Sequence, residues 1–245
     1  MFQLEAWEAI YNGYSGLLSA PTGTGKTYAL LVPFLLKGLS ESNKNSAEGL
    51  QLIWITPIRA LAKEIELSAQ RAVEGLGLNW QIGIRTGDTA QNIRKQQLKS
   101  FPQILITTPE SLHLLITNPS YPQIFKHLKG IVVDEWHEMV GSKRGVQMQL
   151  ALALLSSLVP KLQEWGISAT IGNIEEAADV LLGTYTVAEK RKWIKSDIEK
   201  KIDVHTIIPE KVASYPWAGH LGIKMADKLI PLILSSNSTL IFTNT

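Results

Sequence analysis

Residues 20–27 read APTGTGKT, and this glycine-rich stretch stands between a short apolar run and a segment with helical spacing of apolar residues. The unpaired N–H groups at a helix start and the helix dipole attract anions, and glycines let the backbone wrap closely around one. The stretch therefore predicts a phosphate-binding loop between a strand and a helix, although Ala20 replaces the glycine with which the usual pattern begins. A glycine-rich turn carrying a surface lysine is the alternative.

The candidate nucleotide-binding residues follow from the chemistry of such loops. A lysine reaches the outer phosphates of the nucleotide, and the hydroxyl that follows it can bind Mg²⁺, a role that falls to Thr27. The expected binding residues are Thr22, Gly23, Thr24, Gly25, Lys26 and Thr27.

Short apolar runs alternate with amphipathic segments along most of the chain. We expect strands at 16–20, 50–56, 80–85, 104–107, 130–134 and 166–169, and helices that include 59–76 and 146–158. Wholly apolar strands separated by helices indicate an α/β fold with a mostly parallel sheet covered on both faces. Ligands of such sheets bind at the carboxyl ends of the strands, which is where the loop 20–27 would lie.

A second chemical signal follows the apolar run GIVV at 130–133. Asp134 and Glu135 come next, and a phosphate-loop enzyme needs such carboxylates as its second element. We expect Asp134 to bind Mg²⁺, mainly through water, and Glu135 to orient and deprotonate the attacking water. The alternative is an acidic strand end that caps the next helix.

Composition narrows the class of protein. The 245 residues carry a formal net charge of +2, which does not by itself indicate nucleic acid, and they include no cysteine. Disulfides, cysteine-bound zinc and iron–sulfur clusters are thus excluded, and the five histidines show no metal-ligand spacing. The apolar runs are too short to cross a bilayer, and the acidic, amphipathic start is unlike a signal peptide, so we expect a cytoplasmic protein.

Taken together, the motifs resemble a superfamily 2 helicase of the DExH-box type. The order SAPTGTGKT, TPIRALAKEI, RTGDT, ILITTPESLHLL, VVDEWHEMVGSKRGVQ, SATIGN, YPWAGHLG and LIFTNT is similar to the Lhr-like branch, and most similar to the bacterial ligase-associated DEXH-box helicase family. The resemblance covers nearly the whole chain and implies a RecA-like P-loop NTPase domain that uses ATP and Mg²⁺.

The resemblance also implies roles for single residues. Gln3 corresponds to the glutamine that recognises adenine in these helicases, and His137 completes the catalytic group formed with Lys26, Asp134 and Glu135. Ser168 and Thr170 correspond to the motif that couples hydrolysis to movement of the nucleic-acid strand.

Three further segments correspond to the family's nucleic-acid motifs. A helix start with exposed N–H groups and hydroxyls also suits a sequence-neutral phosphate contact, although each segment read alone is equally compatible with an ordinary helix cap. The expected contacts are Pro57, Arg59, Thr86, Gly87, Thr108, Pro109 and Glu110. Arg94, Lys95 and Lys99 favour a solvated helix face over a row that binds a strand.

The amino-acid composition changes in the last quarter of the chain, where a charge-dense run appears. We expect residues 1–188 to form the RecA-like domain, and residues 189–245 to form a connector and the truncated start of a second RecA-like domain. The charge-dense run 189–201 favours a solvated connector or an edge strand over a nucleic-acid patch. Strands at 202–208 and 239–243 and a helix at 222–235 are expected to follow.

The resulting hypothesis is a motor lobe of a DNA-dependent ATPase and helicase. The resemblance implies 3′-to-5′ movement on single-stranded DNA, a role in DNA repair, and a DNA ligase and a nuclease as partners. An RNA-directed or translocase-only motor remains open, as does a module that binds ATP or DNA without turnover, because the motif VI arginines of the second lobe lie outside these residues. A P-loop kinase or a transporter ATPase fits DEWH and SAT poorly.

Overall fold

The computed structural model describes residues 1–41, 47–169, 172–183, 186–198, 202–207 and 226–242. The chain divides into two compact units, Met1–Glu199 and Lys200–Thr245. The first unit contains the sheet and most of the helices, and all of the site residues considered below lie in it.

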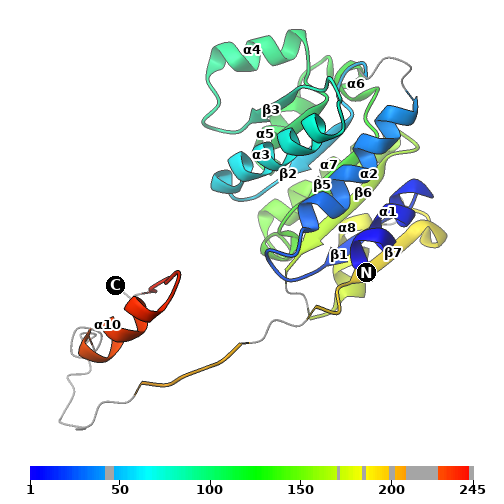
Figure 1. The fold of residues 1–245 in the computed structure, drawn as a ribbon. Coiled ribbons are helices and arrows are strands. Elements are labelled where there is room, and N and C mark those ends of the chain that lie inside the picture. The colour runs from blue at the N-terminus through cyan, green and yellow to red at the C-terminus, as the bar shows by residue number, and fades with distance from the viewer. Residues whose placement is uncertain (42–46, 170–171, 184–185, 199–201, 208–225, 243–245) are drawn as a thin grey trace. The chain divides into compact units, whose positions relative to one another are not determined.

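A seven-stranded sheet forms the centre of the first unit (Figure 1). Its strands are β1 (Ser15–Ser19), β2 (Leu52–Ile55), β3 (Ile82–Arg85), β4 (Ile104–Thr107), β5 (Gly130–Val133), β6 (Gln163–Ser168) and β7 (Arg191–Lys195). They lie in the order β3-β4-β2-β5-β6-β1-β7, and every pairing is parallel. The α/β class with a parallel sheet is confirmed.

Helices cover both faces of the sheet (Figure 1). The helices are α1 (Phe2–Tyr11), α2 (Lys26–Glu41), α3 (Arg59–Gly75), α4 (Gln91–Lys99), α5 (Pro109–Ile116), α6 (Tyr121–Phe125), α7 (Lys143–Leu158), α8 (Ile174–Leu182) and, in the second unit, α10 (Ala226–Ser235), with short 3₁₀ turns η1 (Trp136–Glu138) and η2 (Ala188–Lys190). Trp54 packs with α1, α2 and α3, whereas its strand neighbours Ile53 and Ile55 pack with α5, α7 and α8. This alternation explains why the strands are apolar throughout.

Three helices begin at residues whose side chains cap them. Thr108 accepts a hydrogen bond from the N–H of Ser111, Ser142 caps α7 in the same way, and Asn173 caps α8. Such caps satisfy N–H groups that the helix leaves unpaired, typically with about 1 kcal/mol of stabilisation each. They fix where each helix starts relative to the strand before it.

The expected elements of the first unit form with shifted ends. The strand expected at 166–169 begins three residues earlier, at Gln163, because Gln163 and Glu164 are buried despite being polar. Part of the charged run 189–201 forms β7, which pairs with β1 at the edge of the sheet. The edge-strand interpretation of that run is therefore the one that the structure supports.

The expectation of two strands in the second unit is wrong for the residues described. Neither 202–207 nor 239–242 forms a strand. A strand needs neighbours to pair with, and an apolar run cannot provide them alone. The helix expected at 222–235 corresponds to α10, with residues 222–225 outside the described part. Among the described helices, none has the length and apolar character needed to span a membrane.

Candidate functional site

The loop 20–25 joins β1 to α2, as the sequence predicts. Gly23 and Gly25 have φ angles of +79° and +85°, a region that residues with a Cβ rarely adopt. The hydroxyl of Thr24 donates to the carbonyl of Pro21 over 2.7 Å, and the N–H of Ala20 donates to the carbonyl of Ser168 over 3.2 Å. One hydrogen bond within the loop and one to the end of the neighbouring strand β6 thus fix its conformation.

Gln3 reaches this loop from α1. Its side-chain amide donates to the carbonyl of Thr24 over 3.4 Å, and a Cβ added to Gly25 would lie 2.7 Å from the same amide nitrogen. The glycine therefore permits a close approach between the glutamine and the loop. Recognition of adenine by Gln3 stays a prediction.

Asp134 lies at the carboxyl end of β5, and it is buried. Its carboxylate accepts hydrogen bonds from the indole N–H of Trp54 at 3.3 Å and from the backbone N–H of Glu135 at 2.9 Å. Burial and the neighbouring charge of Glu135 raise the pKa of Asp134 to about 6, while both hydrogen bonds and the charge of Lys26 oppose the rise. Nothing in the sequence indicates this contact with Trp54, which lies 80 positions before Asp134 within an apolar run.

A pocket of about 250 Å³ brings the loop and the strand end together. Its lining includes Thr22, Gly23, Lys26, Thr27, Asp134 and Glu135 from the sequence-derived set, and Leu61, Glu64, Ile65 and Ser68 from α3. The ammonium nitrogen of Lys26 is shielded from solvent. The α3 residues recur three or four positions apart, which is the signal of one helix face, but nothing in the sequence indicates that this face meets the loop.

The donors in this pocket suit a magnesium nucleotide. Mg²⁺ prefers oxygen ligands and keeps much of its water, which fits one carboxylate and one hydroxyl beside a lysine that can bind phosphate. Asp134 supplies the carboxylate and Thr27 the hydroxyl, and both line the same pocket. The sequence-derived ligands are thus brought together.

Glu135 adopts a left-handed conformation, with φ +47° and ψ +45°. It is the one described residue other than glycine with positive φ, and such strain persists where surrounding contacts enforce it. Its carboxylate lies 3.5 Å from Nδ1 of His137, and the hydroxyl of Ser168 lies 3.1 Å from the same nitrogen. A continuous polar chain therefore runs from Glu135 to the end of β6, while Thr170 lies outside the described residues.

The expected nucleic-acid residues gather at the carboxyl ends of β2, β3 and β4, which are adjacent strands. Arg59 pairs with Asp88 at 2.9 Å and packs against Gly87, where an added Cβ would lie 2.8 Å from the guanidinium. Arg94 donates to the carbonyls of Thr86 and Gly87 over 2.8 and 2.7 Å. The expectation for Arg94 as part of a solvated face is therefore wrong, because it holds this loop in place.

Arg144 joins two of these segments. Its guanidinium donates to Glu110 over 2.7 Å and to the carbonyl of Pro57 over 3.5 Å. The residue lies in the first turn of α7, within the stretch GSKRGVQ, whose position in the sequence gives no indication of these contacts. Pro57 and Glu110 are thus brought together by a residue that sequence reasoning did not single out.

The comparison with known proteins agrees with this arrangement. The pattern of the family "DEAD/DEAH box helicase" matches residues 1–177. The chain is 35% identical to the ATP-dependent helicase Lhr-Core of Methanothermobacter thermautotrophicus over 96% of its own length and 29% of that protein, and 33% identical to the protein of the same name from Saccharolobus solfataricus over 99% and 28%.

A solved structure extends the likeness to three dimensions. The Mycobacterium smegmatis helicase Lhr, bound to single-stranded DNA and AMP-PNP, superimposes with a TM-score of 0.80 at 29% identity, covering all of this chain and 32% of that one. The chain thus spans less than a third of the length of these relatives. The matching pattern, the parallel sheet and the motif positions place the chain in the DEAD/DEAH box helicase family.

Proposed function

We propose that this chain is the ATP-binding motor lobe of a DNA helicase or translocase that couples ATP hydrolysis to movement on single-stranded DNA. The observation that supports the proposal most directly is the shared pocket of Lys26, Thr27, Asp134 and Glu135 at the carboxyl edge of the sheet. The Lhr structure with single-stranded DNA and AMP-PNP is a precedent for such a lobe.

In the proposed reaction, the P-loop amides and Lys26 hold the phosphates, and Thr27 and Asp134 hold the metal. Bound Mg²⁺ supplies positive charge to the phosphate oxygens as the γ-phosphoryl group is transferred. Glu135 orients the attacking water and accepts its proton. The contact between Glu135 and His137 holds the carboxylate in one orientation, and Trp54 does the same for Asp134.

The polar chain from Glu135 through His137 to Ser168 supports a coupling role for the last of these residues. Ser168 also accepts the N–H of Ala20 at its backbone carbonyl, so it contacts both the loop and the carboxylate segment. A change in the conformation of the loop would alter the position of the end of β6 through these contacts. Thr170 is proposed to act with Ser168, by the family resemblance alone.

Single-stranded DNA is proposed to lie along the carboxyl ends of β2, β3 and β4. The start of α3, where no side chain caps the helix, provides backbone N–H groups there, and the side chain of Arg59 is 60% exposed. Contacts of this kind recognise the phosphate backbone and carry no sequence preference.

The experiment that tests the proposal measures steady-state ATP turnover by the longer protein that contains this lobe, with no nucleic acid, with single-stranded DNA and with single-stranded RNA. Strong stimulation by DNA is expected. Equal turnover in all three conditions would refute coupling to nucleic acid, and stimulation by RNA alone would favour an RNA-directed motor.

The finer assignments rest on the family resemblance. The expected boundary at residue 188 is moved here, because β7 (Arg191–Lys195) pairs with β1: we propose that the first lobe continues through β7 and that Lys200–Thr245 contains the connector and, by the resemblance, the opening of a second RecA-like lobe. A setting in DNA repair, with a DNA ligase and a nuclease as partners, is proposed on the same ground. Co-purification of either partner with the longer protein would support that setting.

A further inference from the structure

Helix α3 contributes one face to the proposed ATP pocket. Its lining residues are Leu61, Glu64, Ile65 and Ser68. Glu64 is the one carboxylate among them, and it is exposed. The pocket is therefore lined by three carboxyl groups, those of Asp134 and Glu135 after β5 and that of Glu64 on α3. The first two have roles in the proposed reaction, whereas Glu64 has none.

The side chain of Glu64 differs in its contacts from the two other glutamates of α3. The carboxylate of Glu66 pairs with Lys63, and that of Glu74 accepts a hydrogen bond from the amide of Gln70 over 3.0 Å. Within the part of the chain that the structure describes, the carboxylate of Glu64 makes no hydrogen bond and no ion pair. Its oxygens are therefore available to a ligand or to water in the pocket.

The two carboxylates that follow β5 already have partners. One oxygen of Asp134 accepts from the indole N–H of Trp54, and the other accepts from the backbone N–H of Glu135. The carboxylate of Glu135 lies 3.5 Å from Nδ1 of His137. Since a carboxylate has about four lone-pair sites, these contacts use part of what the two groups could offer to metal-bound water. Among the described lining residues, Glu64 is the carboxylate that keeps all of its acceptor sites.

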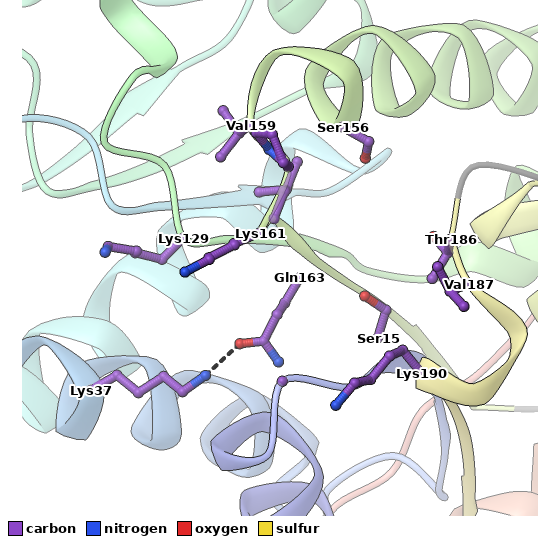
Figure 2. A pocket seen from close by; sticks show the side chains of 13 residues that line it. Ser15, Lys37, Lys129, Ser156, Val159, Lys161, Gln163, Thr186, Val187 and Lys190 are labelled. Atoms are coloured by element: carbon purple, nitrogen blue, oxygen red, sulfur yellow. Dashed lines mark hydrogen bonds between the residues drawn. The ribbon is translucent and has the colours of Figure 1, made fainter.

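A larger pocket, of about 540 Å³, shows that carboxylates are not a general feature of the cavities in this unit (Figure 2). It lies at the opposite edge of the sheet, where Ser15 opens β1 and Lys129 stands directly before β5. No acidic side chain is among the described residues that line it. The ATP pocket has three carboxyl groups in less than half that volume. Like charges so close together repel one another, and a divalent cation relieves that repulsion.

We propose that Glu64 is a positioning residue of the metal site, which accepts hydrogen bonds from water bound to Mg²⁺. In nucleotide sites Mg²⁺ keeps several of its waters, and the hydrogens of these waters need acceptors. Loss of such an outer acceptor typically lowers metal affinity by about 10- to 100-fold. The inference rests on the proposed function, because it needs a magnesium nucleotide in this pocket. Helix α3 would thereby contact both the metal site and the DNA that Arg59, its first residue, is proposed to bind.

The test measures the affinity of a fluorescent ATP analogue for the longer protein, once with excess Mg²⁺ and once with EDTA. Glu64→Gln keeps the shape of the side chain and removes its charge. With Mg²⁺ the affinity should fall by about tenfold, because the metal-bound water loses its charged acceptor. With EDTA the affinity should stay the same or rise by roughly twofold, because a charge that repels the phosphates is gone. A residue that only supports the fold would weaken binding in both media alike.

Two further variants complete the experiment. Glu74→Gln is the matched control, since it changes an exposed glutamate of the same helix outside the pocket, and it should change neither affinity. Asp134→Asn should lower the affinity with Mg²⁺ and tests the proposed function itself. If it does so while Glu64→Gln has no effect, or weakens binding equally in both media, the inference is overturned and the proposed function stands. If neither variant changes the dependence on Mg²⁺, the proposed function fails together with the inference.

Discussion

The hydroxyl of Ser168 lies 3.1 Å from Nδ1 of His137, and the same nitrogen lies 3.5 Å from the carboxylate of Glu135. One imidazole therefore contacts both the residue proposed to activate water and the end of the strand β6. Because Ser168 also receives the N–H of Ala20 at its carbonyl, the strand end contacts the phosphate loop as well. This is the physical connection through which hydrolysis could be linked to movement of a bound strand.

Replacing Ser168 with alanine should separate the two activities. The hydroxyl that contacts His137 is lost, while the backbone contact with Ala20 remains. In the longer protein we expect ATP turnover within about threefold of normal and roughly tenfold fewer base pairs unwound per ATP, or fewer still. Ser157→Ala, on the exposed side of α7, is the control. An unchanged ratio of unwinding to ATP turnover would refute the coupling role.

Glu135→Gln should stop turnover without stopping nucleotide binding. The amide cannot accept the proton of the attacking water, and loss of such a group typically lowers the rate by about 10²- to 10⁴-fold. Turnover is measured by phosphate release, and binding by titration with a fluorescent ATP analogue. The control Glu175→Gln changes an exposed carboxylate in the first turn of α8 and should retain turnover. Lys26→Ala should lose both properties, and near-normal turnover in either site variant would contradict the assignment.

The phosphate loop and the strand end at Asp134 could be predicted because each is a local pattern: a short apolar run followed by residues of specific chemistry. Contacts between residues that are far apart in the sequence could not be predicted in this way. Arg144 lies 34 positions from Glu110 and 87 from Pro57, and only the packing of α7 brings them together. The start of β6 was missed for a related reason, since Gln163 and Glu164 are polar and are tolerated in the core by partners far along the chain.

Arg144→Ala should weaken binding of single-stranded DNA. Without the guanidinium, the carboxylate of Glu110 and the carbonyl of Pro57 lose the group that joins their two segments. Both contacts are partly exposed, so we expect about a tenfold loss of affinity or less, measured by fluorescence anisotropy at fixed salt. Binding of the ATP analogue should be unchanged. Arg71→Ala, which removes an exposed charge from α3, is the control, and an equal loss in both variants would indicate only a change in net charge.

Gly25→Ala should impair nucleotide binding through backbone strain. The residue has φ +85°, and the new Cβ would lie 2.7 Å from the side-chain nitrogen of Gln3, so the loop or α1 must move. Strain of this kind costs about 1–3 kcal/mol, which corresponds to roughly 5- to 150-fold in affinity. Gly75→Ala is the matched control, because nothing lies within 4 Å of the added Cβ and its φ is not positive. Equal affinity in both variants would show that the loop tolerates the change.

The buried Glu164 should make the stability of the first unit depend on pH. Burial raises its pKa from the ordinary 4.5 to about 8, so the folded chain holds a proton that the unfolded chain releases above about pH 4.5. The contribution of this residue to stability is therefore fully present below about pH 4.5, and it is lost as the pH rises to about 8. Each unit of pKa difference corresponds to about 1.4 kcal/mol, so the total loss amounts to a few kcal/mol.

Urea unfolding at pH 5, 7 and 9 measures this effect, with Glu164→Gln as the comparison. The amide has no proton to lose and can still accept from Ser156, whose hydroxyl donates to the carboxyl group in the unsubstituted chain. The free energy of unfolding should fall more steeply between pH 5 and pH 9 in the unsubstituted chain than in the variant. Because other groups titrate in both proteins, the difference between the two curves isolates this residue. Parallel curves would mean that Glu164 is ionised in the folded chain at neutral pH, with the hydroxyls of Ser156 and Thr186 sufficient to stabilise its charge.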